Sequence, residues 1–75
     1  MPHINIKCYP KHLNEVEFTN FIDELNAVIQ KHLKATDEVI SIQYTEIDPE
    51  NWGEVYHNEI EPNLATLAKK PGYKL

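Results

Sequence analysis

Apolar and polar side chains alternate along residues 3 to 9. Ile4, Ile6 and Cys8 would share one face of a strand, with polar residues on the other face. Pro10 has no N–H to contribute to a sheet, so we expect the strand to end there. The pattern predicts a short, half-buried strand in which Cys8 is a small core residue rather than a nucleophile.

The next stretch repeats apolar residues at three- and four-residue spacing, which predicts an amphipathic helix at about residues 15 to 34. Asn14 is followed three residues later by Glu17, the pattern of a capping box at a helix start. His32 lies on the apolar stripe, and we interpret it as a helix-end histidine rather than a metal ligand.

Apolar and polar side chains alternate again near residues 38 to 47, which predicts a second strand. Two strands joined by a long helix form a right-handed unit with parallel strands. Asp48 and Pro49 then begin a helical segment that Pro62 should kink or restart and residues 69–72 should end. We therefore predict an α/β fold: a single β-α-β unit with a C-terminal helical segment.

The chain of 75 residues is expected to be one domain, residues 1–75. Domains this short bury a modest core and are marginal alone. Cys8 is the only cysteine, so no disulfide can form within the chain. A two-stranded sheet also leaves both of its edges unpaired. We expect a homo-oligomer in which a second copy completes the sheet.

Composition excludes several classes of function. The formal net charge is −5, with seven lysines and no arginine, which argues against nucleic-acid binding. No apolar run reaches the ~18 residues of a membrane span, and the N-terminal residues lack a signal-peptide core. With the lone cysteine, this predicts a cytoplasmic protein without a membrane partner. The histidines have no metal-ligand spacing, so no metal is expected; they are His3, His12, His32 and His57.

Pro2 is the main candidate for chemistry. Aminopeptidases remove an initiator methionine when a small residue follows, and removal of Met1 would leave Pro2 as a secondary amine. Free α-amino groups titrate near ~7.7–8.0, and desolvation or nearby cations lower the pKa of an amine. An amine beside an apolar pocket could thus be largely neutral at pH 7, as a general base must be.

The order of Pro2, strand, helix, strand and Trp52 resembles the 4-oxalocrotonate tautomerase superfamily, and the opening segment is similar to its small dimeric bacterial, phenylpyruvate-type branch. The resemblance covers nearly the whole chain. The segments that carry it are Met-Pro-His-Ile-Asn-Ile-Lys-Cys-Tyr-Pro-Lys at 1–11, Ile-Ser-Ile at 40–42, Pro-Glu-Asn-Trp at 49–52 and Lys-Lys-Pro-Gly-Tyr at 69–73.

The resemblance implies roles for a few residues. Pro2 matches the catalytic base of the family, and Trp52 matches an aromatic wall that keeps the pocket dry. Two arginines that bind substrate in well-known members are missing here: the first position falls at Lys11 or His12, and the second at about Ser41. Lysine supplies a point charge without the bidentate fork of arginine, so a monoacid is the easier substrate.

The expected function is an isomerase that converts the enol form of a 2-oxo acid, such as phenylenolpyruvate, to the keto form without a cofactor. An alternative within the same fold is hydration or dehalogenation of unsaturated acids. Another is a non-catalytic oligomerisation module in which Pro2 is incidental. A dimer is expected because the chain beyond residue 48 looks helical, unlike the short hairpin that links dimers in hexameric relatives.

Overall fold

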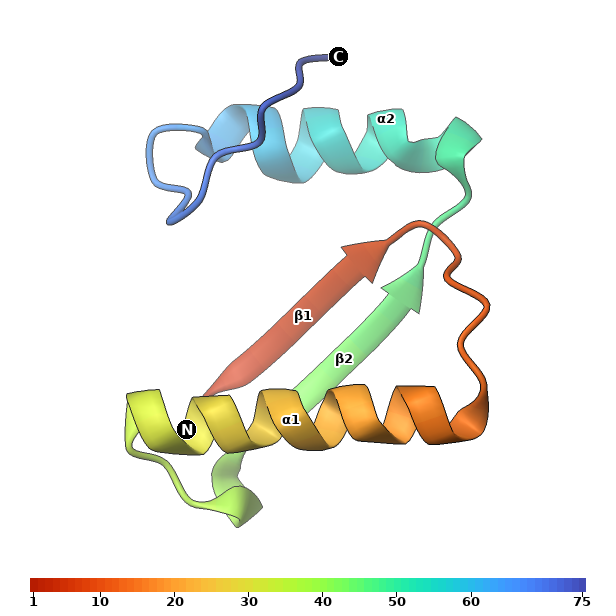
Figure 1. The fold of residues 1–75 in the computed structure, drawn as a ribbon. Coiled ribbons are helices and arrows are strands. Elements are labelled where there is room, and N and C mark those ends of the chain that lie inside the picture. The colour runs from red at the N-terminus through yellow and green to blue at the C-terminus, as the bar shows by residue number, and fades with distance from the viewer.

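The structure, a computed structural model, describes residues 1–75 and contains the predicted β-α-β unit (Figure 1). Two strands lie parallel in one sheet, in a register that runs from His3 opposite Ser41 to Cys8 opposite Glu46. The main elements are β1 (His3–Cys8), α1 (Glu15–Leu33), β2 (Ser41–Glu46) and α2 (Trp52–Val55). The helix α1 connects the strands and lies across one face of the sheet.

The start of α1 has the predicted capping box. The Asn14 side chain accepts a hydrogen bond from the Glu17 N–H at 2.8 Å, and the Glu17 carboxylate accepts one from the Asn14 N–H at 3.0 Å. These bonds satisfy two donors that a helix start would otherwise leave free. The helix ends at Leu33, one residue earlier than predicted, because Lys34 takes a left-handed conformation with φ of 53°.

The second strand is shorter than the alternating sequence predicts. It begins at Ser41 rather than near residue 38, because Asp37–Val39 form a turn of 3₁₀ helix. The Asn26 amide of α1 donates to the Asp37 carboxylate at 2.7 Å and ties this turn to the helix. Side-chain alternation could not reveal a turn that a distant amide holds in place.

The C-terminal segment is helical as predicted, but it consists of short turns of different kinds and ends before residues 69–72. A 3₁₀ turn at Pro49–Asn51 leads into α2, a wider π turn follows at Tyr56–Ile60, and a second 3₁₀ turn covers Glu61–Asn63. Pro62 has no N–H for a regular α-helical bond, which is consistent with the tighter turn around it.

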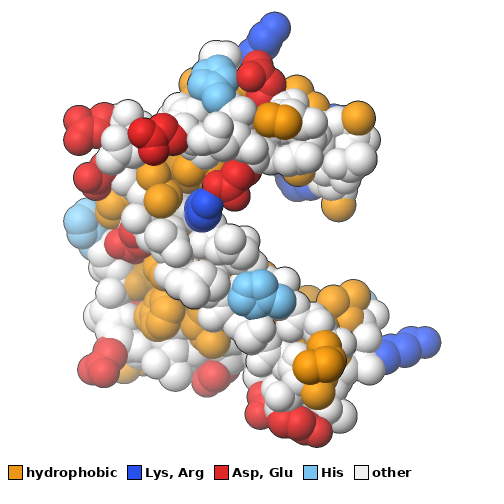
Figure 2. Space-filling view, turned by 180° about the vertical axis from the view of Figure 1, so that it is seen from behind, with side chains coloured by type: hydrophobic (Ala, Val, Ile, Leu, Met, Phe, Trp, Pro, Cys, Tyr) orange, Lys and Arg blue, Asp and Glu red, His pale blue; other side chains and the backbone are white.

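The protomer has little interior. Only Ile29, Val55 and Tyr56 are buried, whereas Phe21 and Val28 on α1 remain 38% and 53% exposed. The radius of gyration is 14.2 Å, against about 11 Å for a compact chain of this length. Figure 2 shows the reason: a hollow separates the part of the molecule built around α1 from the part built around α2. The open sheet and exposed apolar helix agree with completion of the fold by oligomerisation.

None of the helices is both long enough and apolar enough to cross a membrane.

Candidate active site

Pro2 lies immediately before β1 and is fixed by the sheet. Its carbonyl accepts a hydrogen bond from the Ser41 N–H at 3.2 Å, while Met1 before it is fully exposed. Next to it, His3 Nδ1 and Ser41 Oγ are 2.7 Å apart. With Met1 attached, the Pro2 nitrogen is an amide without basic character; loss of Met1 would turn it into an amine held at the edge of an ordered strand.

Trp52 lies at the other end of the molecule, where the carboxyl end of β1 meets α2. Its indole N–H donates to the Tyr73 hydroxyl at 2.9 Å, and its ring packs edge-to-face on Tyr9 with centroids 5.4 Å apart. These aromatics line a largely apolar hollow of about 420 Å³ that could accept an apolar group. The lining residues are Lys7, Cys8, Tyr9, Trp52, Tyr73 and Leu75.

Lys11 and His12 occupy the loop between β1 and α1. His12 is left-handed, with φ of 54°. Lys11 borders a second apolar hollow of about 320 Å³ between the sheet and the start of α1. Cys8 borders both hollows, so the two adjoin at the end of β1. The Cys8 thiol, half-buried as predicted, donates to the Tyr44 hydroxyl at 3.5 Å.

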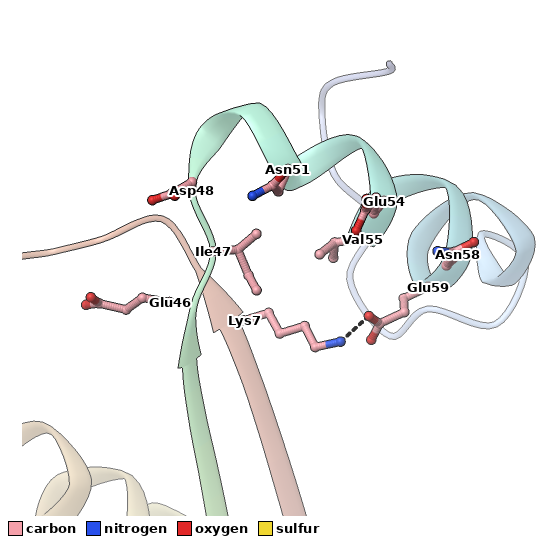
Figure 3. A pocket seen from close by; sticks show the side chains of 9 residues that line it. All are labelled: Lys7, Glu46, Ile47, Asp48, Asn51, Glu54, Val55, Asn58 and Glu59. Carbon is pink, nitrogen blue, oxygen red and sulfur yellow. Dashed lines mark hydrogen bonds and ion pairs between the residues drawn. The ribbon is translucent and has the colours of Figure 1, made fainter.

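A polar groove of about 490 Å³ separates the strand ends from α2 (Figure 3). Figure 3 shows the Lys7 amine directed at the Glu59 carboxylate, with which it forms an ion pair. Glu46 and Asp48 lie on the far side of this groove from Glu59. The acidic side chains give the groove a negative character, and no group of three or more possible metal-ligating side chains is found in the chain.

Within one protomer, the residues predicted to form the site fall into two groups. Pro2 and Ser41 are at the amino end of the parallel strands, whereas Lys11, His12 and Trp52 are at the carboxyl end. The six residues of β1 separate these ends by about 20 Å, at roughly 3.3 Å per residue. A single protomer therefore does not bring the predicted base and the aromatic wall together.

The structure adds residues that the sequence pattern did not single out. Lys7 alternates with the apolar residues of β1, and it borders the hollow of Trp52. Tyr9 and Tyr73 complete that hollow, and Tyr73 also packs against Tyr56 with ring centroids 5.8 Å apart. Tyr73 belongs to the segment 69–73 that carries the resemblance, but no local pattern indicates its contact with Trp52, 21 positions away.

The fold thus defines the class as a small β-α-β protein with an unclosed parallel sheet, a half-buried proline at one end and an aromatic hollow at the other. No family model matches the sequence. Curated relatives named Tautomerase PptA do match it over nearly its whole length.

The relative from Pectobacterium carotovorum is 46% identical over 74 residues, which cover 97% of each chain. The Escherichia coli relative is 43% identical over 75 residues, and the Klebsiella pneumoniae relative 36% identical over 75, each with 100% of both chains covered. The chain belongs to the 4-oxalocrotonate tautomerase superfamily, in its small bacterial phenylpyruvate-type branch. It is an isomerase of the tautomerase class. The names of its relatives therefore favour an enzyme over a non-catalytic module.

Proposed function

We propose that this protein converts the enol form of a 2-oxo acid such as phenylenolpyruvate to the keto form, with the Pro2 amine as general base. The observation that carries the proposal is the position of Pro2. Its carbonyl is bound to Ser41 in the sheet, while Met1 projects fully exposed beyond it. Cleavage after Met1 would therefore leave a nitrogen in a fixed place.

The reaction needs one proton acceptor and one proton donor. The Pro2 nitrogen takes the proton of the enol hydroxyl, the oxygen forms a C=O bond, and the electron pair of the C=C bond takes a proton at the adjacent carbon. The protonated amine can supply that proton and return to its starting state. An α-amino group with a pKa near ~7.7–8.0 can exchange a proton in both directions at neutral pH. The proposal calls for no metal or other cofactor.

We further propose that the site forms between two copies of the chain arranged as a homodimer. A two-fold axis that runs the sheets of two protomers antiparallel places the amino end of one β1 beside the carboxyl end of the other. Pro2 and Ser41 of one copy would then face Trp52 and Lys11 of its partner. This arrangement accounts for the separation of the two groups in a protomer and for the open sheet.

In this composite site each group has a defined role. Lys11, or His12 beside it, binds the substrate carboxylate, and Trp52 excludes water and packs on the apolar part of the substrate. Ser41 supplies a neutral hydrogen bond next to the base. A hollow lined mainly by aromatic and aliphatic groups suits an aryl substituent.

We also place the protein in the cytoplasm, because its one cysteine is free and free thiols persist in a reducing compartment.

Blocking the amine tests the assignment of Pro2. A glutamine inserted between Met1 and Pro2 would prevent removal of the methionine, and intact mass spectrometry would verify both chains. We expect near-background ketonisation of phenylenolpyruvate from the blocked chain, because its proline nitrogen stays an amide. Unchanged circular dichroism and light scattering would show that folding and assembly are preserved. Equal rates for the blocked and processed chains would contradict the assignment.

A further inference from the structure

Glu46, the last residue of β2, connects three parts of the fold through one carboxylate oxygen. Its Oε2 accepts the Tyr44 hydroxyl at 2.9 Å and the backbone N–H of Lys11 at 3.1 Å. The Tyr44 oxygen in turn accepts the Cys8 thiol at 3.5 Å. Hydrogen bonds therefore run from β1 through β2 to the loop that precedes α1.

The electrostatics favour this arrangement. The Lys11 N–H, and after it the Tyr44 hydroxyl, hold the pKa of the Glu46 carboxyl below its ordinary value, and the charges of His12 and Lys11 act in the same direction. The hydrogen bond with Cys8, burial and the bond with Glu46 raise the pKa of Tyr44. Glu46 is consequently an acceptor and Tyr44 a donor at neutral pH.

The loop that Glu46 holds has few other restraints in its middle. The capping box fixes its far end at Asn14, and His12 takes a left-handed conformation that few side chains adopt readily. Figure 3 shows the Glu46 side chain directed away from Lys7. The carboxylate binds the backbone of Lys11 and not its ammonium, which forms no ion pair in the protomer.

We propose that Glu46 is a positioning residue for substrate binding: it fixes the Lys11 backbone so that the Lys11 ammonium stays free to meet the substrate carboxylate. The inference rests on the proposed function of Lys11. Tyr44 orients the Glu46 carboxylate and shares in the role. Neither residue touches the reacting atoms, so both act on substrate affinity rather than on proton transfer.

The hydrogen bond can be tested without any assay of activity. In a pH titration followed by NMR, the chemical shift of the Lys11 amide proton should change with a midpoint below the pKa of an ordinary glutamate, about 4.3. Glu46→Gln should abolish this step. Glu24→Gln, which changes an exposed α1 carboxylate without a side-chain hydrogen bond, should leave it intact. A step that persists unchanged in Glu46→Gln would show that the Lys11 amide does not sense the Glu46 carboxylate, and would contradict the hydrogen bond.

Kinetics then tests the consequence for substrate binding. Glu46→Ala should raise KM by up to about ten-fold, the effect expected for loss of Lys11 itself, with kcat almost unchanged. Tyr44→Phe should shift KM in the same direction by less. In a Lys11→Ala background, Glu46→Ala should have no further effect on KM, because it acts through the lysine that has been removed. Glu24→Gln again serves as the control.

The outcomes separate this inference from the proposed function. Additive effects of Glu46→Ala and Lys11→Ala, or a KM that Lys11→Ala does not change, would overturn the positioning role. A Lys11 amide that does not titrate with Glu46 would overturn it even in a fully active enzyme. If the processed protein ketonises no enol substrate, the proposed function fails, and the positioning role falls with it although the amide titration still establishes the hydrogen bond.

Discussion

A chain with seven lysines and no arginine has to bind a carboxylate with lysine, which supplies a point charge, or with neutral hydrogen-bond donors. Two lysines lie near the carboxyl end of β1. The Lys7 amine is already paired with Glu59, whereas the Lys11 ammonium forms no ion pair in the protomer. At the scale of single residues, Lys11 is therefore the cation more available to a substrate.

Replacing Lys11 tests its proposed role. If it binds the substrate carboxylate, Lys11→Ala should mainly raise KM, because an interaction made equally in the ground and transition states leaves kcat unchanged. A hydrogen bond to a charged group contributes about 1.5–3 kcal/mol and a partly exposed ion pair about 1 kcal/mol or less, so we expect kcat/KM to fall on the order of ten-fold. Steady-state kinetics on phenylenolpyruvate measures both constants.

Three further variants serve as comparisons. Lys11→Arg should be tolerated and should improve binding of a diacid, because it restores a bidentate donor. If Lys11→Ala leaves KM unchanged while His12→Ala raises it, the substrate carboxylate is bound by His12, one residue further along the loop. A rise in KM with Lys7→Ala alone would instead assign the role to the lysine that borders the hollow of Trp52.

At the scale of elements, the sequence predicted best where the signal is local. The alternation of Ile4 and Ile6 and the capping pair of α1 involve neighbours in sequence, and both are observed. The 3₁₀ turn before β2 depends on Asn26, eleven positions away from its partner Asp37. The C-terminal segment mixes three kinds of turn, and apolar spacing does not distinguish these when each spans only a few residues.

The capping box allows a prediction about stability. Asn14→Ala removes an acceptor from the start of α1 and should lower the free energy of unfolding by about 1 kcal/mol. Urea denaturation at one fixed chain concentration measures the change, since association shifts apparent stability. Glu17→Gln keeps a side-chain acceptor for the Asn14 N–H and should cost less. Equal stability of Asn14→Ala and the parent protein would show that tertiary contacts alone determine where α1 begins.

At the scale of the whole molecule, the sequence predicted an open two-stranded sheet and an oligomer. It did not predict that Pro2 and Trp52 would lie at opposite ends of the strands. Periodicity assigns a residue to an element and a face, but which residues meet across an interface depends on the symmetry of the assembly. A list of candidate residues therefore does not define a site when they come from two chains.

Assembly as a dimer is the corresponding prediction. Light scattering at micromolar concentration should give twice the 8.7 kDa of one chain. Mixed dimers then test the composite site: a chain with blocked Pro2 is refolded together with a Trp52→Ala chain. If the base and aromatic wall come from different copies, the mixture should regain about one quarter of the parental sites, while each chain refolded alone stays nearly inactive.

Two results would contradict this arrangement. A particle of 8.7 kDa would exclude a stable dimer. A mixture no more active than its two components, although light scattering and tags show that mixed dimers form, would mean that each site is built within one chain.

The small interior of the protomer also affects the stability of a newly synthesised chain before it associates. With three buried residues and two free strand edges, a chain that has just left the ribosome has little to hold it together until it meets a second copy. Rare transcripts would leave such chains alone for longer, exposed to proteases and to wrong partners. Synthesis of neighbouring copies on one message shortens this wait, so for a chain that matures only as the proposed dimer the rate of expression would help to determine the fraction that matures.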